Sequence, residues 1–217
     1  MSNIKLVHSG GNSVSLTTPD SNPAANRTFK LPGADGSSGQ ALVTDGSGAL
    51  SFGTPAGAGK ILSVQQAVKT DVASYSTGSS TLADSFFDIS GLSVTLTPSS
   101  GTKCFVSYTV NIGGETGYDA GIALIRDTTQ IYLGDGASNR IRLSNYYVID
   151  AGHKTYAANG QFLDTHGANG STAVTYKLQM YVATPGRTTR VNRSHDDGDD
   201  RSSGRLASQI TVMEVAS

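Results

Sequence analysis

The sequence predicts an all-β protein, in which a shorter β-rich segment precedes a C-terminal antiparallel β-sandwich. Three observations support this fold class. Helical patterns are nearly absent from the 217 residues, and short apolar runs mostly alternate with polar residues. Gly, Asp, Asn or Pro interrupts these runs at intervals of about 8–12 residues, which is typical of sandwiches and barrels. Glycine supplies 26 residues, or about 12%, against about 7% in average proteins.

The first part of the chain contains short strand-like runs that cannot bury their own apolar faces. These runs are NIKLVHS, SVSLTT, RTFKL, QALVT and ALSFG, and the last two predict a β-hairpin that turns at residues 45–48. So few bulky groups cannot offset the entropy of ordering, about 1–2 kcal/mol per residue for the backbone. The segment is therefore either disordered or shared by several copies around a common axis, and its regular punctuation favours the second.

A joint rich in Gly, Ala and Pro, GTPAGAGK at residues 53–60, separates this segment from the rest. We therefore expect a shaft or docking segment over residues 1–58 and the sandwich over 59–217. The stretch 60–77 carries both helical and strand patterns, and its β-branched residues favour a strand. The clearest later strands are KCFVSYTVNI, VTYKLQMYVA and LSVTLTP. Their predicted inward residues are Cys104, Val106, Tyr108, Val110, Ile112, Val174, Tyr176, Leu178, Met180, Val182, Leu92, Val94 and Leu96.

The last strand, ASQITVMEV, differs because it is apolar on both faces. Ile210 and Val212 share one face, and Met213 and Val215 lie on the other. A strand with two apolar faces is expected to be covered on both. In a two-sheet sandwich the second cover is most simply a sister subunit. The candidate residues for contact between subunits are Phe29, Leu31, Leu42, Leu50, Phe52, Met213 and Val215.

Composition excludes several classes of partner. Charged residues make up 15% of the chain and the net charge is −1, which gives no basic surface for nucleic acid. No stretch has the length of about 20 apolar residues that a membrane span needs, and the first residues lack the apolar core of a signal peptide. We therefore expect a chain that is used as it stands, in soluble form. Cys104 is the only cysteine, so we expect a small buried side chain there.

Three catalytic patterns are absent: the G-x-S-x-G elbow, the P-loop and the H-E-x-x-H helix. The four histidines are isolated from one another in the sequence. We therefore expect no enzyme activity, no cofactor and no metal site. The acidic run NRSHDDGDDRSSGR could collect oxygen ligands for Ca²⁺, but it does not match an EF-hand loop. A solvated loop whose charge is balanced by Arg193, Arg201 and Arg205 is the favoured interpretation.

Several segments together resemble a known protein family. NRTFKLPGADGSSGQALVTDGSGALSFG resembles a segment of bacteriophage tail fibre and virion appendage proteins. FFDISGLSVTLTPSSGTKCFVSYTVNI, STAVTYKLQMYV and GRLASQITVMEVAS resemble the terminal domain of the same group. The resemblance implies a homotrimer in the virion. Its N-terminal segment would dock on a tail or capsid protein, and a jelly-roll-like knob would meet a host surface receptor, with polysaccharide as one candidate.

Strand parity sorts the loops of the sandwich. Ten strands are counted after the joint, at about 61–69, 86–97, 103–112, 120–126, 129–133, 140–149, 156–164, 173–183, 188–194 and 205–215. If they run up and down, the longer loops gather at the end far from the shaft, where recognition is expected. The expected distal receptor-binding residues are Tyr75, Glu115, Tyr118, Asp119, Asp135, His166, Asn169, His195, Asp196, Asp197, Asp199 and Asp200.

Tyrosines beside polar loops could either stack on sugar rings or pack at strand edges. The sequence weighs these two roles evenly for Tyr118, Tyr132, Tyr146, Tyr147 and Tyr156. Two functions therefore remain: an appendage that binds a host receptor, and a trimeric decoration protein without a receptor. The resemblance and the length of the distal loops favour the first.

Overall fold

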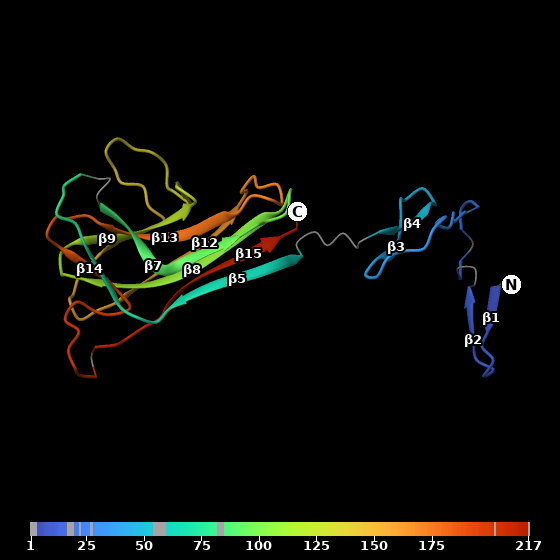
Figure 1. Cartoon of the computed structure of the whole chain (residues 1–217), viewed down its shortest axis with the longest axis horizontal. Coiled ribbons are helices and arrows are strands. Elements are labelled where there is room, and N and C mark those ends of the chain that lie inside the picture. The colour runs from blue at the N-terminus through green and yellow to red at the C-terminus, as the bar shows by residue number, and fades with distance from the viewer. Residues whose placement is uncertain are drawn as a thin grey trace. The chain divides into compact units, whose positions relative to one another are not determined.

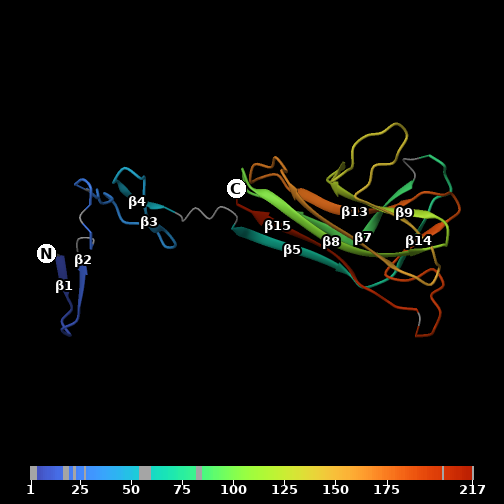
Figure 2. The ribbon, with the colours of Figure 1, turned by 180° about the vertical axis from the view of Figure 1, so that it is seen from behind.

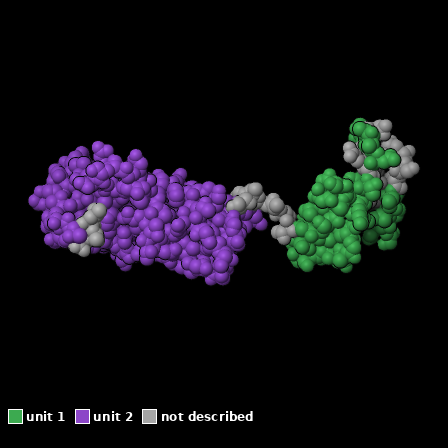
Figure 3. Space-filling model, turned by 90° about the horizontal axis from the view of Figure 1, so that it is seen from above, with its two compact units in different colours: residues 1–56 green, residues 57–217 purple. Residues whose placement is uncertain are grey.

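The computed structural model describes residues 4–16, 20–21, 23–26, 28–53, 60–81, 85–201 and 203–216. The chain divides into two compact units, residues 1–56 and 57–217, which Figure 3 shows in different colours. The division lies within the joint identified in the sequence. Each unit is described by itself below, and the described residues of both contain strands and no α-helix.

The N-terminal unit holds two short β-hairpins. In the first, β1 (Ile4–Val7) pairs with β2 (Ser13–Leu16). In the second, β3 (Ala41–Thr44) pairs with β4 (Leu50–Gly53), which confirms the predicted hairpin. Asp45 Oδ1 stabilises its turn by accepting hydrogen bonds from the backbone N–H groups of Ser47 and Ala49. The strand predicted for RTFKL is wrong, because its described part forms only an isolated bridge through Lys30.

The C-terminal unit consists of two antiparallel sheets that pack face to face (Figures 1 and 2). One sheet has the order β5-β15-β8-β14-β6, with β12 also paired to β8. The other has the order β10-β9-β13-β7, with β11 also paired to β9. The strands are β5 (Ile61–Lys69), β6 (Ala73–Ser76), β7 (Phe86–Leu96), β8 (Lys103–Gly114), β9 (Asp119–Arg126), β10 (Thr129–Ile131), β11 (Asn145–Val148), β12 (Tyr156–Asp164), β13 (Val174–Val182), β14 (Thr188–Val191) and β15 (Ser208–Val215).

The core between the sheets contains the residues that alternation placed inward. All thirteen inward residues predicted for β7, β8 and β13 are buried, as are Ile210 and Val212 of β15. Cys104 is fully buried, as expected for a small apolar side chain. Burying one large apolar side chain contributes about 1.5–3 kcal/mol. All members of this core belong to the C-terminal unit.

In three places, two consecutive strands run in the same direction along the same neighbour instead of reversing. We call each such pair one interrupted line. β10 and β11 both pair with the same edge of β9, since β13 occupies its other edge. β14 and β15 likewise share one edge of β8, opposite β12. β6 pairs with β14 and β5 pairs with β15, so β5 and β6 form the third line. Within the described residues the sandwich therefore has eight strand lines, four in each sheet.

The eight lines fix which loops share an end. We call the end where the Ala216 N–H donates to the Lys60 carbonyl the base end, and the opposite end the tip end. The connections β6–β7, β8–β9, β11–β12 and β13–β14 lie at the tip end. The connections β7–β8, β9–β10 and β12–β13 lie at the base end.

The parity prediction is therefore wrong for part of the chain. It counted β10 and β11 as strands that reverse, and did the same for β14 and β15. Loops 150–155 and 184–187, expected near the shaft, lie at the tip end, and loop 165–172 lies at the base end. Residues 134–139 and 195–204 are not turns between reversing strands but insertions within a line.

Candidate binding surfaces of the sandwich

A compact cluster at the tip end joins Glu115, Tyr118 and Arg187. The Arg187 guanidinium carbon lies 4.1 Å from the Tyr118 ring centre, and Nη1 donates a 2.8 Å hydrogen bond to Glu115 Oε2. This hydrogen bond is the main reason that the pKa of Glu115 lies below its ordinary value. Glu115, Tyr118 and Asp119 thus lie at the tip end, where the sequence placed them. Arg187 was missed because its loop was assigned to the other end.

The insertion 192–207 attaches to the tip end through its first residues. The backbone N–H groups of His195 and Asp196 donate to the Gly152 carbonyl at 2.9 and 3.2 Å. Gly152 belongs to the β11–β12 connection, which is a tip loop. His195 and Asp196 are therefore held beside the tip cluster, and electrostatic attraction to His195 contributes a little to the lowered pKa of Glu115.

Ion pairs hold the next turn of this insertion. Asp197 Oδ2 lies 3.0 Å from Arg193 Nη1 and 2.8 Å from Arg205 Nη2. Two of the three arginines expected as counter-charges therefore pair with one aspartate. Asp199 and Asp200 are exposed in the same insertion. Among the described residues, no group of three or more His, Cys, Asp or Glu side chains is placed to hold a metal ion.

His166 and Asn169 do not lie at the tip end, so their predicted distal position is wrong. His166 Nε2 lies 3.3 Å from Thr102 Oγ1, and the Gly170 N–H donates to the Pro98 carbonyl. Thr102 and Pro98 belong to the β7–β8 connection at the base end. The error follows from the strand count, because the miscounted β10–β11 line inverted the direction of β12.

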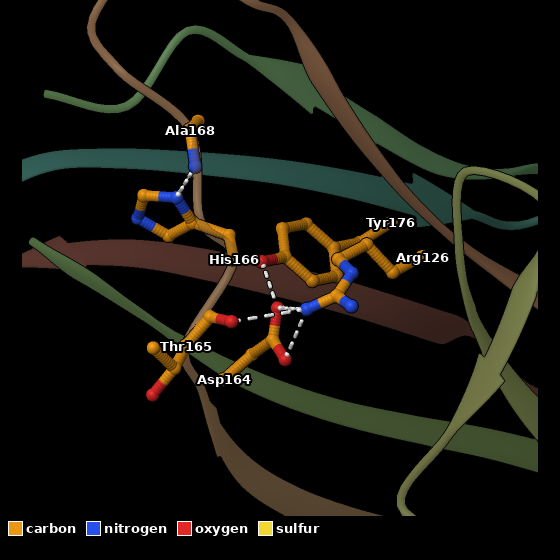
Figure 4. A network of polar contacts seen from close by, with 6 residues as sticks. All are labelled: Arg126, Asp164, Thr165, His166, Ala168 and Tyr176. Carbon is orange, nitrogen blue, oxygen red and sulfur yellow. Dashed lines mark hydrogen bonds and ion pairs between the residues drawn. The ribbon is translucent and has the colours of Figure 1, made fainter. Parts of the chain in front are cut away.

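Next to His166, a buried polar network joins the two sheets at the base end (Figure 4). Asp164 ends β12, and both of its carboxylate oxygens accept from Arg126 Nη1 of β9 at 2.9 Å. Asp164 Oδ2 also accepts a 2.7 Å hydrogen bond from Tyr176 of β13. Burial, and then Asp164, raise the pKa of Tyr176 above its ordinary value. These contacts brace the sheets, and Figure 4 shows the three side chains converging.

Two further predicted residues have other surroundings than expected. Tyr75 was assigned to a distal loop but belongs to β6, and its ring packs 6.0 Å from the Phe87 ring against the core. Tyr75 therefore lies at the tip end as a residue that packs on the core, not as a residue of an exposed loop. Asp135 is exposed in the insertion between β10 and β11, along the edge of β9. Asp135 lies at this edge and not in a loop at the tip end, because β10 and β11 run in the same direction along β9.

The N-terminal unit leaves its apolar residues exposed. Phe29 is 68% exposed, Leu31 is 73% exposed, and Leu42 and Phe52 are exposed as well, while Leu50 is half-buried. A single copy therefore does not bury these side chains. Contact between subunits at these positions stays a prediction.

An apolar row crosses the outer face of the six-stranded sheet. The pairing register places Val64 of β5 beside Met213 of β15, Met213 beside Phe105 of β8, and Phe105 beside Leu163 of β12. Val64 is 52% exposed and Leu163 is 49% exposed, while Phe105 and Met213 are half-buried. Val215, two residues beyond Met213, is half-buried too. We call Val64, Met213, Phe105 and Leu163 the outer row.

The sequence identified only Met213 of the outer row. A signal existed for Phe105, which is the bulky apolar member among outward-facing Ser107, Thr109 and Asn111 of the same strand. Val64 and Leu163 could not be added because their alignment with Met213 depends on strand pairing.

Comparison with known proteins gives no family for this chain. No family model matches it, and no curated protein matches it. In the described part of the chain, no helix is long and apolar enough to cross a membrane.

Proposed function

We propose that this chain is a structural protein of a bacteriophage virion, a tail fibre or similar appendage that attaches the particle to the host cell. In this proposal three copies associate, the N-terminal unit docks on a tail or capsid protein, and the sandwich meets a host surface receptor. The resemblance of residues 26–53 and of the sandwich strands to phage appendage proteins motivates the identity. No enzyme activity is part of the proposal.

The observation that carries the proposal is apolar surface left open in both units. The exposed Phe29, Leu31 and Leu42 suit a shaft in which sister chains cover one another. The outer row of the sandwich offers a second surface of the same kind. Interface cores are depleted in charge, and the row is followed along the sheet by the uncharged Ser107 and Thr211. Self-association is the simplest use of such surfaces.

The order of the strand lines supports a jelly-roll-like knob. Counting the interrupted lines once, the sheets run 1-8-3-6 and 2-7-4-5. Most consecutive lines then lie in opposite sheets, and two four-stranded sheets face each other, as in an eight-stranded double-sheet jelly roll. The tip loops would then form the recognition end. Glu115, Tyr118 and Arg187 are its proposed centre, with His195 and Asp196 beside them.

The first test is the mass of the full chain in solution by light scattering, beside a chain that starts at Lys60. Three chains of 22.4 kDa each are expected for the full chain. A single chain at concentrations where the protein is folded would refute the shared-core argument for the N-terminal unit. Three chains for residues 60–217 alone would show that the sandwich carries contacts of its own, for which the outer row is the proposed surface.

The second test is attachment of the labelled protein to host cells. Tyr118→Ala and Arg187→Ala are expected to weaken attachment, because both remove tip-end contact area. Asn169→Ala is the matched control, since Asn169 is exposed but lies at the base end. Substitution of Gly113 is unsuitable, because an added Cβ would lie 2.3 Å from the Arg193 carbonyl oxygen.

The alternative is a trimeric decoration protein without a receptor. It is favoured by the internal pairing of the tip charges, since Glu115 pairs with Arg187 and Asp197 pairs with Arg193 and Arg205. Attachment at the wild-type level by both tip variants would argue against the tip as the receptor site. Absence of attachment by the wild-type trimer would favour decoration.

A further inference from the structure

A groove of about 540 Å³ crosses the edge strand β12 on the side of the sandwich. Its walls come from three elements: β8, β12 and the first residue after β10. The residues that the argument uses are Ser107, Thr109, Tyr132, Asn159, Gly160 and Gln161. None of the groove residues is charged. The groove shares no lining residue with the tip cluster or with the charged insertion.

Tyr132 forms an aromatic wall that is held in a strained backbone conformation. Its φ of 55° lies in the left-handed region, which is a genuine outlier for a bulky residue and costs about 1–3 kcal/mol. Its ring packs at 5.3 Å from the Phe162 ring and is tilted by 34°, yet 38% of the residue stays exposed. The fold therefore fixes an exposed ring at the groove instead of relaxing the backbone.

Amides and hydroxyls line the same groove as this ring. Thr109 Oγ1 donates a 2.7 Å hydrogen bond to Asn159 Oδ1, and this contact orients the Asn159 side chain. Asn159 and Gln161 are exposed at alternate positions of β12, and Ser107 and Thr109 lie opposite them on β8. The groove is therefore lined by a row of neutral donors and acceptors and by the Tyr132 ring.

Gly160 has no side chain and so leaves room for the Tyr108 ring at the floor of the groove. An added Cβ would lie 2.3 Å from Cζ of Tyr108, because the Tyr108 ring passes beneath β12 at this position. The Tyr108 hydroxyl then donates a 2.6 Å hydrogen bond to Asn145 Oδ1, and Asn145 Nδ2 donates to the Asn159 carbonyl. The floor is thus braced between the two sheets, and it is preorganised for a ligand.

We propose that this groove binds a neutral saccharide unit. A pyranose ring has an apolar face that packs on Tyr132, and its hydroxyls match the carboxamides of Asn159 and Gln161 in both donor and acceptor character. An acidic sugar or a nucleic acid is disfavoured, because no Lys or Arg lines the groove. The identification of this saccharide with the host surface rests on the proposed function, whereas its chemistry does not.

The test is binding of the full chain to a printed array of neutral hexose and N-acetylhexosamine oligosaccharides, with uronic-acid oligosaccharides as the charged comparison. Tyr132→Asn removes the ring while keeping a residue that tolerates positive φ, and Gln161→Ala removes one carboxamide. Each is expected to weaken neutral binding by about tenfold or more, the usual effect of losing a central contact. Tyr146→Ala is the matched control, because Tyr146 is 51% exposed and lies outside the groove.

The outcomes separate this inference from the proposed function. Neutral binding that falls in both groove variants and persists in Tyr146→Ala supports the groove. No binding by the wild-type protein, binding of acidic oligosaccharides only, or neutral binding at the wild-type level by both groove variants overturns it. Attachment to host cells is measured in parallel on the same proteins. If the protein attaches to cells without groove-dependent sugar binding, the proposed function stands and the groove inference fails. If it binds sugar in the groove without attaching to cells, the groove inference stands and the proposed function fails.

Discussion

Removal of the Asp164 carboxylate is the most informative perturbation of the sandwich, because this group joins both sheets. Asp164 is 4% exposed, and Tyr176, which donates to it, is fully buried. In Asp164→Ala the Tyr176 hydroxyl loses its acceptor in the core, and Arg126 loses its counter-charge. Because 26% of the Arg126 side chain stays exposed, water partly compensates for that loss.

The expected loss of unfolding free energy follows from these exposures. A buried hydroxyl left without a partner costs about 1–3 kcal/mol, and breaking a buried ion pair costs about 3–5 kcal/mol. Since Arg126 is partly solvated, we expect about 2–4 kcal/mol in total. The matched control is Asp88→Ala. Asp88 also accepts from two side chains, Lys177 and Gln179, but 56% of its side chain is exposed, so about 0–1 kcal/mol is expected.

The assay is urea-induced unfolding at pH 7 and at one fixed protein concentration, because association would shift the apparent stability. The difference between Asp164→Ala and Asp88→Ala should exceed about 1 kcal/mol. Equal losses in the two variants would refute the reasoning that burial, rather than the number of hydrogen bonds, sets the cost. A small loss in Tyr176→Phe together with a large one in Asp164→Ala would assign most of the cost to Arg126.

Three further predictions test other parts of the molecule. The pKa of Glu214 lies below its ordinary value: burial opposes ionisation, but donors from Ser99, Thr102 and Ser63 outweigh it. Its stabilising effect, measured against Glu214→Gln, should be constant above the usual glutamate pKa of about 4.3 and shrink as pH falls through the lower folded value; an advantage that grows on acidification would contradict this. Gly160→Ala should cost about 1–3 kcal/mol through overpacking on Tyr108, whereas Gly136→Ala, whose Cβ meets nothing within 4 Å, should change the urea midpoint little. In the chain that starts at Lys60, Val64→Glu should lower the mass measured by light scattering by disrupting the outer row, and Val72→Glu, exposed but outside that row, should leave the mass unchanged.

The alternation of residues determined much of the fold directly. The two faces of a strand follow from a side-chain period of two. This period is visible in KCFVSYTVNI and VTYKLQMYVA, and the inward residues assigned from it are buried. The hairpin of β3 and β4 depends on a turn within a few residues. Both are local properties of the chain, so the sequence alone was sufficient for them.

Only the tertiary structure decided whether a run reverses or continues. Nothing local distinguishes β10 and β11 from a reversing pair. They form one line because both pair with the same free edge of β9. That choice moved His166 and Asn169 to the base end and left Tyr132 at the edge of β12. The outer row has the same origin, because Val64 and Leu163 meet Phe105 and Met213 only through pairing across the sheet. Hydrogen bonds between distant strands set these positions, and the energy of those bonds does not appear in the pattern of any single strand.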